Sequence, residues 1–294
     1  MSFMRAFRPT NSRVRLGVGL ILAALFCIQC TRSEAVRDDN VVTVVDGKTI
    51  GHVSPARLAE LEKLAKTNQI ELLKQSIEHY RVSYQDYTCT FSKTERIDGQ
   101  LRATQKVDVK FRQAPFSVAM HWLVNAPTAD RMLFVQGKYD GQMLVMPKGM
   151  LSLVTGGAVL RDPAGKDAMA NTLRPVSMFG FENAMTNLLD VYQIAAKRNE
   201  LQTSFLGYGE ICGRKVFILQ RVLPYTKEYA ARAAKTTVVY LDVEYLVPLA
   251  LENHDWTDQL VSKYTYSDIK FNLGLGDKDF TPEANDIQYN PAQK

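Results

Sequence analysis

Residues 87–122 read YTCTFSKTERIDGQLRATQKVDVKFRQAPFSVAMHW and contain the clearest secondary-structure pattern in the chain. Large or apolar side chains alternate with polar ones, beginning with Tyr87, Cys89 and Phe91. A period of two places the two sets on opposite faces of a β-strand. Asp98-Gly99 is typical of a two-residue hairpin turn. The stretch therefore predicts consecutive antiparallel strands with one buried face.

The same period continues towards the C-terminus. After Ala114-Pro115, one predicted strand face carries Phe116, Val118, Met120 and Trp122, and the opposite face carries Ser117 and His121. Further strands are predicted at residues 131–136, 142–146, 203–208, 216–222, 237–243, 248–253 and 260–272. The number of short consecutive strands predicts a large antiparallel meander.

Helical periodicity occurs on both sides of the first strands. Ser54-Pro55 is a typical helix start, and apolar residues at helical spacing continue to about Ser83, with a break at Asn68. Residues 181–197 predict a second helical region, residues 154–175 a loop, and residues 224–236 one or two helical turns. The predicted fold class is α+β: a large curved antiparallel sheet, or half-barrel, with helices packed on its concave face.

The N-terminal segment has the pattern of a secretion signal. Arg5, Arg8, Arg13 and Arg15 precede an uncharged apolar run of 13 residues, 16–28. That run is shorter than the roughly 20 apolar residues of a membrane-spanning helix. Residues 1–35 therefore predict a signal peptide cleaved after Ala35. The alternative is a lipid-anchored protein acylated at Cys27 or Cys30.

The remaining chain is expected to form a flexible tether (36–53), a single domain (54–280) and a loose C-terminal tail (281–294). Of the 36 basic and 31 acidic side chains, five arginines and one acid fall within residues 1–35, leaving 31 and 30. This balance gives no reason to expect a nucleic-acid partner. The exported part is expected to function in the periplasm or cell envelope.

Common catalytic and metal-binding patterns are not evident. Gly165-Lys166-Asp167 lacks the hydroxyl and spacing of a phosphate-binding loop, and the four histidines are scattered. No glycine-serine elbow occurs, and no cysteine has a histidine nearby in sequence. The sequence therefore predicts a protein without cofactor or metal that is not an enzyme.

The apolar strand faces provide the candidate site. They either form an ordinary packed core or line a cavity for an apolar ligand. Methionine suits a cavity because its side chain adapts to different ligand shapes. The candidate residues for the cavity are Phe111, Phe116, Val118, Met120, Trp122, Met132, Phe134 and Met143.

Cys89 and Cys212 are the only cysteines after residue 35. In an oxidising compartment they could form one disulfide, or both could remain thiols.

Several motifs resemble an uncharacterised family of bacterial secreted proteins over about residues 72–280. The motifs are Tyr87–Phe91, Lys93–Arg96, Pro115–Val118 with Met120 and Trp122, Asp255-Trp256, Tyr264–Asp268, Asn272, Gly274-Leu275 and Asp279-Phe280. This family looks related to the LolA-like superfamily of periplasmic lipoprotein carriers and lipoprotein-sensing regulators. That resemblance implies a half-barrel closed by helices, with an apolar cavity that takes acyl chains.

Three functions follow in order of preference. The first is non-enzymatic binding of a lipid or an acylated protein in the cell envelope. The second is a protein-interaction or sensor module with a filled core, and the third is an uncharacterised hydrolase. A cavity would distinguish the first two, and a buried carboxylate or histidine facing that cavity would favour the third.

The signal-peptide hypothesis predicts that the exported protein begins at Val36, because Ser33 and Ala35 are small where the peptidase cleaves. N-terminal sequencing of exported material tests this. An acylated, blocked Cys27 or Cys30 would instead establish lipid anchoring.

Overall fold

The computed structural model describes residues 53–291, so the predicted signal peptide and nearly all of the predicted tether lie outside the described residues. Within residues 53–291, no helix combines the length and apolar character needed to span a membrane. The helices of this region are α1 (Pro55–Thr67), α2 (Gln69–Ser83), α3 (Met150–Thr155), α4 (Lys166–Met169), α5 (Phe181–Lys197) and α6 (Lys227–Arg232), with short 3₁₀ segments at η1 (Tyr139–Gly141), η2 (Val176–Met178), η3 (Asp277–Phe280) and η4 (Glu283–Asn285).

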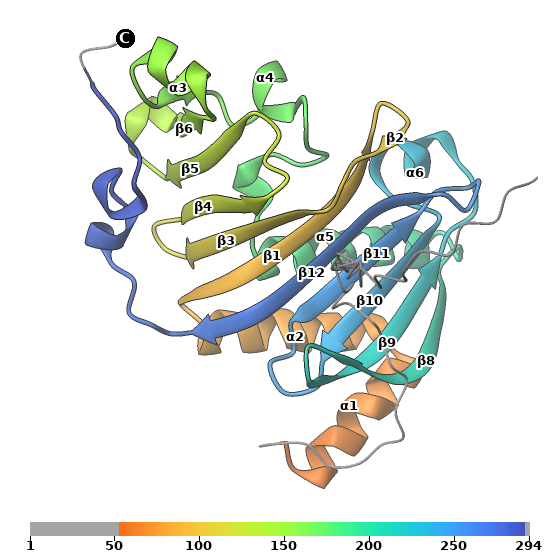
Figure 1. The fold of residues 1–294 in the computed structure, drawn as a ribbon. Coiled ribbons are helices and arrows are strands. Elements are labelled where there is room, and N and C mark those ends of the chain that lie inside the picture. Colours follow the sequence, from red (N-terminus) through yellow and green to blue (C-terminus); the bar gives the residue numbers. More distant parts are fainter. Residues whose placement is uncertain (1–52, 292–294) are drawn as a thin grey trace, which may run out of the picture. The chain divides into compact units, whose positions relative to one another are not determined.

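The strands form one large antiparallel sheet. They are β1 (Asp86–Ile97), β2 (Gln100–Leu101), β3 (Gln105–Arg112), β4 (Ser117–Val124), β5 (Ala129–Val135), β6 (Met143–Pro147), β7 (Val159–Arg161), β8 (Gln202–Ile211), β9 (Arg214–Val222), β10 (Thr236–Asp242), β11 (Pro248–His254) and β12 (Leu260–Phe271). Their spatial order is β7-β6-β5-β4-β3-β1-β12-β11-β10-β9-β8, and β2 pairs with β1 (Figure 1). The predicted α+β class with a large antiparallel sheet is confirmed, and the sheet is open.

Local capping explains the first two helices. Ser54 accepts a hydrogen bond on its side chain from the Arg57 amide at 3.2 Å, and proline occupies the first helical position. Asn68 ends α1 and also caps α2, because its side-chain oxygen accepts a hydrogen bond from the Glu71 amide at 3.0 Å. The predicted helix start and the predicted break are both confirmed, as is the helix at residues 181–197.

The hairpin prediction is also confirmed. Ile97 pairs with Gln100, and both Asp98 and Gly99 have positive φ angles, 51° and 76°. Two consecutive positive φ values are the geometry of the hairpin turn that Asp-Gly favours. The region expected to be a loop, residues 154–175, contains the last two residues of α3 and two short elements, β7 and α4.

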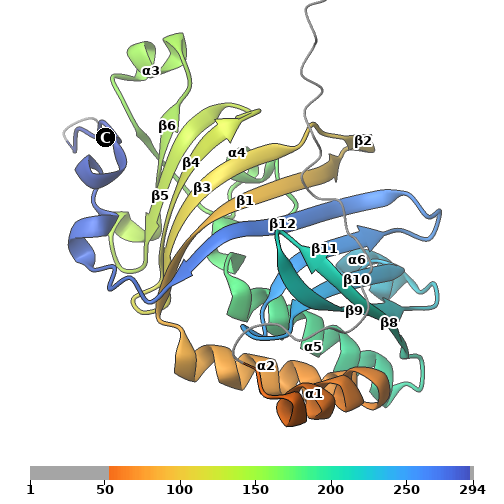
Figure 2. The ribbon, with the colours of Figure 1, turned by 60° about the horizontal axis from the view of Figure 1, so that its bottom comes forward.

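The concave face of the sheet is covered by α2 and α5 (Figure 2). The first residue of α5, Phe181, packs against Tyr87 of β1 and Tyr266 of β12, with ring centroids 4.9 and 4.7 Å apart. Tyr80 of α2 lies against the same phenylalanine at 6.1 Å. These aromatic contacts hold the helices over the middle of the sheet.

The opposite face of the sheet is covered by the C-terminal segment. Phe280 and Ile287 are buried against outward-facing Leu133 and Leu144. The prediction of a loose tail is wrong for residues 281–291, because these apolar side chains complete a second hydrophobic cluster. Ser117 points outward as predicted, but the same segment buries it.

Asp86 directs the chain from the end of β12 to this outer face. Its carboxylate accepts hydrogen bonds from the backbone amides of Leu273 (2.6 Å), Gly274 (3.1 Å) and Leu275 (3.2 Å). A carboxylate that receives several amide donors forms strong, charge-assisted hydrogen bonds. Asp86 therefore anchors the segment that follows the last strand.

Replacing Asp86 with alanine should loosen residues 273–291. Three amides would lose their acceptor, at a cost of about 1–3 kcal/mol. Hydrogen exchange should accelerate at these residues and not in α5. Glu78→Ala, which removes an exposed carboxylate from α2, is the control. Unchanged exchange in Asp86→Ala would contradict the anchoring role.

Candidate functional site

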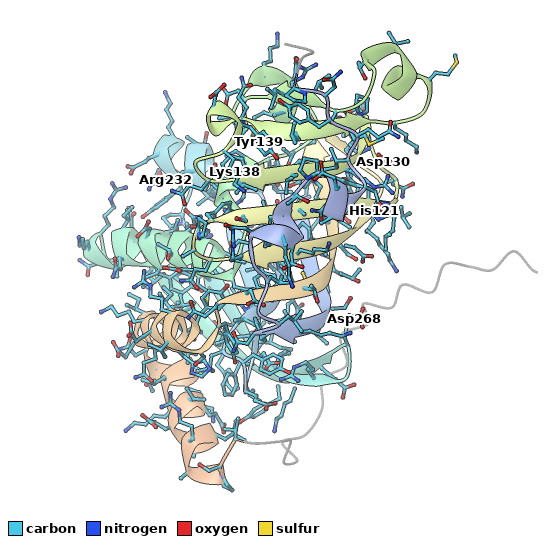
Figure 3. All side chains as sticks on the ribbon, turned by 90° about the vertical axis from the view of Figure 1, so that its left-hand side faces the viewer. His121, Asp130, Lys138, Tyr139, Arg232 and Asp268 are labelled. Atoms are coloured by element: carbon cyan, nitrogen blue, oxygen red, sulfur yellow. The ribbon has the colours of Figure 1, made fainter. Side chains whose placement is uncertain are left out.

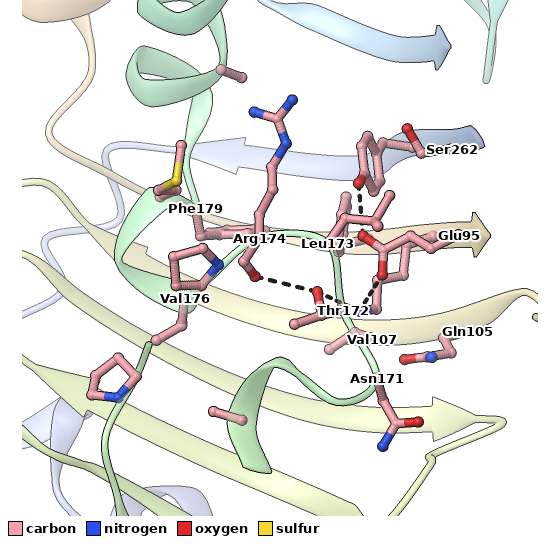
Figure 4. A pocket seen from close by; sticks show the side chains of 18 of the residues that line it. Glu95, Gln105, Val107, Asn171, Thr172, Leu173, Arg174, Val176, Phe179 and Ser262 are labelled. Carbon is pink, nitrogen blue, oxygen red and sulfur yellow. Dashed lines mark hydrogen bonds and ion pairs between the residues drawn. The ribbon is translucent and has the colours of Figure 1, made fainter. Parts of the chain in front are cut away.

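A cavity of about 960 Å³ lies on the concave side of the sheet. Strands from both halves of the sheet form its floor, and residues 163–180, α5 and α6 form the rest of the wall. Figure 4 shows residues 171–176 crossing above the strands, with Val107 and Gln105 below. This volume falls at the upper end of the range for small-molecule sites, which is about 300–1,000 Å³.

Four of the eight candidate residues line the cavity. They are Met120, Trp122, Met132 and Met143. The Trp122 indole N–H donates a hydrogen bond to the Gln105 side-chain oxygen at 2.8 Å, which orients the ring. Tyr264, Tyr266 and Phe179 add aromatic surface.

The other four candidates, Phe111, Phe116, Val118 and Phe134, belong to the packed core beside the cavity. Phe111 stacks on Tyr87 at 4.8 Å and meets Phe116 edge-on at 5.4 Å. A Cβ atom at Gly180 would lie 2.9 Å from the Phe111 ring, and Gly180 has a φ of 109°. Only glycine allows α5 to begin so close to this ring.

The inner face of the sheet changes from apolar to polar along its strands. On β1, Phe91 is followed on the same face by Lys93 and Glu95, and on β12 Tyr264 is followed by Ser262 in the opposite direction. Polar side chains form one line across the sheet, in which each step joins directly paired positions on neighbouring strands, except that Lys93 and Glu95 are two residues apart on β1. We call this line the polar row: Gln105, Lys93, Glu95, Ser262, Asn253, Thr237 and Arg221. All seven residues line the cavity.

Glu95 is a buried carboxylate, 4% exposed, in the middle of this row. The Tyr264 hydroxyl donates to one of its oxygens at 2.7 Å, and the Lys93 ammonium donates to the other at 3.1 Å (Figure 4). Lys93 also donates to the Thr172 hydroxyl at 3.2 Å. Burial and the neighbouring Glu95 raise the pKa of Tyr264 well above its ordinary value. Both carboxylate oxygens thus have partners, as burial requires.

The other end of the polar row is a chain of hydrogen bonds. Asn253 donates to the Ser262 hydroxyl at 3.0 Å, and Thr237 donates to the Asn253 side-chain oxygen at 2.8 Å. Arg221 donates to the Thr237 hydroxyl at 2.7 Å. The cavity therefore has an apolar part, which includes Met120, Met132 and Met143 of β4–β6, and a polar row that crosses the sheet from β3 to β9.

None of the residues of the polar row is among the site residues predicted from the sequence. The available signal was the parity of β1, where Lys93 and Glu95 share a face with Tyr87, Cys89 and Phe91. Charged residues on a predicted inner face indicate either an unusual buried network or a polar cavity.

No disulfide joins Cys89 to Cys212. Cys89 is buried in β1, whereas Cys212 is exposed in the turn between β8 and β9. Three strands separate β1 from β9, and each strand adds about 4.7–4.9 Å. The disulfide alternative is therefore excluded, and burial raises the pKa of the Cys89 thiol.

A second, smaller cavity of about 450 Å³ lies on the outer face of the sheet, beside Ala284 and Asn285. His121 and Asp268 line it, and Figure 3 labels both. His121 thus points outward as predicted. Within residues 53–291, no cluster of three or more His, Cys, Asp or Glu side chains is arranged to hold a metal ion.

The chain belongs to a family described as "Protein of unknown function (DUF1571)", whose model matches residues 84–290. This confirms the uncharacterised family implied by the sequence motifs. No curated protein sequence matches the chain.

Solved structures with a similar arrangement share little sequence with this chain. MucB of Pseudomonas aeruginosa, in complex with MucA, is 15% identical over 76% of this chain and 63% of its own, with a TM-score of 0.45. Lipoprotein LppX of Mycobacterium tuberculosis is 14% identical over 76% of this chain and 99% of its own, with a TM-score of 0.35. A LolA superfamily protein of Nitrosomonas europaea is 10% identical over 79% of this chain and 100% of its own, with a TM-score of 0.28.

The difference between cavity wall and packed core predicts different costs for two alanine substitutions on adjacent strands. Phe111→Ala should lower the free energy of unfolding by about 3–5 kcal/mol, as expected for a buried aromatic. Met120→Ala should cost less than about 2 kcal/mol, because Met120 is only half-buried and already borders empty space. Urea unfolding measures both. Equal losses would mean that the Met120 region is packed as tightly as the core.

Proposed function

We propose that this protein binds a lipid, or the acyl chain of a lipoprotein, without chemical conversion in the cavity of its concave face. The proposed place of action is the cell envelope, which the predicted signal in residues 1–35 supports. The ligand would lie between the sheet and the segment formed by residues 163–180.

The size and lining of the cavity carry this proposal. A volume of about 960 Å³ suits one lipid-sized molecule. Met120, Met132 and Met143 give its apolar part flexible, polarizable side chains that adapt to different chains. The second candidate, an interaction module with a filled core, does not account for a cavity of this size.

A hydrolase remains the third candidate because Glu95 is a buried carboxylate in the cavity wall. Its partners argue for a structural role, since Tyr264 and Lys93 occupy both oxygens. Of the histidines in residues 53–291, none lines the cavity, so no serine there has a histidine base.

Filling the cavity should abolish lipid binding. Val145→Trp places a large ring in the apolar part of the cavity, whereas Val82→Trp adds the same ring to an exposed position on α2. A fluorescent fatty-acid probe should bind the wild type and Val82→Trp, and bind Val145→Trp at least about tenfold more weakly. Native mass spectrometry of the wild type should reveal co-purified lipid.

Thermal unfolding of both tryptophan variants checks that a loss of binding does not reflect a loss of fold. Full binding by a folded Val145→Trp, or a wild type that ignores lipid probes altogether, would refute the proposal. The interaction module would then become the leading candidate.

A further inference from the structure

Arg221 lies at the polar end of the cavity and is 2% exposed. One of its terminal nitrogens, Nη2, donates to the Ala234 carbonyl at 3.0 Å and to the Thr237 hydroxyl at 2.7 Å. Among residues 53–291, its buried Nε has no hydrogen-bond acceptor, and no carboxylate lies within ion-pair distance of the guanidinium. The guanidinium lies over the ring of Tyr192, 5.6 Å from its centroid.

Among residues 53–291, Arg112 is the other buried arginine, and it has an acidic partner, whereas the half-buried Arg96 donates only to the backbone carbonyls of Leu260 and Gly99. Arg214 pairs with Asp242 and with Glu244, and Arg112 pairs with Asp277 at 2.9 Å. A guanidinium remains charged in a protein, so burial without a counter-charge is costly. Burial accordingly lowers the pKa of Arg221 from its ordinary value.

The wall beside Arg221 leaves room for another molecule. The segment carrying α6 contributes only small side chains to this part of the cavity wall, those of Ala230, Ala231, Ala233 and Ala234. The acid in the polar row, Glu95, is already bound by Lys93 and Tyr264. Basic side chains also outnumber acidic ones along the cavity, five to three.

We propose that Arg221 binds the anionic head group of an amphiphile, a carboxylate or a phosphate, whose hydrocarbon chain occupies the apolar part of the cavity. This inference rests on the proposed lipid-binding function and defines the ligand class. Guanidinium groups bind both anions through charge-assisted hydrogen bonds. The hydroxyl and amide groups of Thr237, Asn253 and Ser262 extend from Arg221 along the polar row and can meet the other polar atoms of the head group.

Ligands that share one chain and differ in head group test the proposal. Oleate carries a carboxylate, oleoyl lysophosphatidate carries a phosphate, and monoolein is neutral. With the purified full chain, at least one anionic ligand should bind at least about tenfold more tightly than monoolein, as expected for a hydrogen bond to a charged group. The stronger anionic ligand identifies the head group.

Arg221→Met should lose this preference while still binding monoolein, and Arg221→Lys should keep part of it. Arg102→Met is the control, because it removes the same charge from an exposed position outside the cavity. Equal wild-type affinity for charged and neutral ligands would overturn the proposal, whether or not Arg221→Met folds. So would a folded Arg221→Met that keeps the preference. A wild type that binds none of the three ligands would instead refute lipid binding itself.

Discussion

The pairing of β1 with β12 is the interaction on which the rest of the structure depends. Strands β1–β7 form one meander and β8–β12 form another, and the β1–β12 ladder joins them into a single sheet. Each of these two strands has 12 residues, so the ladder is long. It also brings Glu95 beside Tyr264, Phe91 beside Tyr266, and Asp86 beside the chain that leaves β12. Without this ladder, the two meanders would be separate, and the core and the cavity, which are lined by strands of both, could not form.

The cavity follows from the way this wide sheet is covered. The N-terminus of α5 packs tightly on β1 and β3, where Phe181 contacts Tyr87 and Gly180 lies against Phe111. Towards Met120 and Met143 the covering changes to residues 163–180, which contain only short helical turns. An irregular segment has fewer side chains directed at the sheet than a long helix has. The same strand face is therefore a solid core at one end and a cavity wall at the other.

Local patterns predicted the elements of the fold well. Capping at Ser54 and Asn68, the Asp98-Gly99 turn and the periodicity of residues 181–197 all depend on neighbours in sequence. The alternation of apolar and polar residues along β4 also correctly predicted which of its side chains face the interior and which face outward. The α+β class and the large antiparallel sheet followed from these local signals, whereas β7 lies in a region predicted to be a loop.

Features that depend on distant pairing could not be predicted in this way. The alternation along β3 and β4 identifies an inner face but not which part of that face a helix covers, so Phe111 of β3 and Met120 of β4 could not be distinguished as core and cavity wall. A disulfide between Cys89 and Cys212 looked feasible, because the number of strands that lie between the two cysteines in the sheet cannot be derived from the sequence. Residues 281–291 looked loose because the outward-facing Leu133 and Leu144, against which Ile287 is buried, are 154 and 143 residues before it in the sequence.

The polar row explains why the cavity is stable in a protein interior. Burying Lys93 and Glu95 separately would be unfavourable, but cross-strand register places both beside neutral donors and acceptors. The hydrogen bonds continue through Ser262, Asn253 and Thr237, so the polar atoms of one strand satisfy those of the next. The last residue of the polar row is Arg221, whose Nε has no hydrogen-bond acceptor within the described residues. Because both oxygens of Glu95 have partners and the Nε of Arg221 has none among the described residues, positive charge is left incompletely bound at one end of the cavity. Under the proposed function, this asymmetry would orient a bound anionic amphiphile.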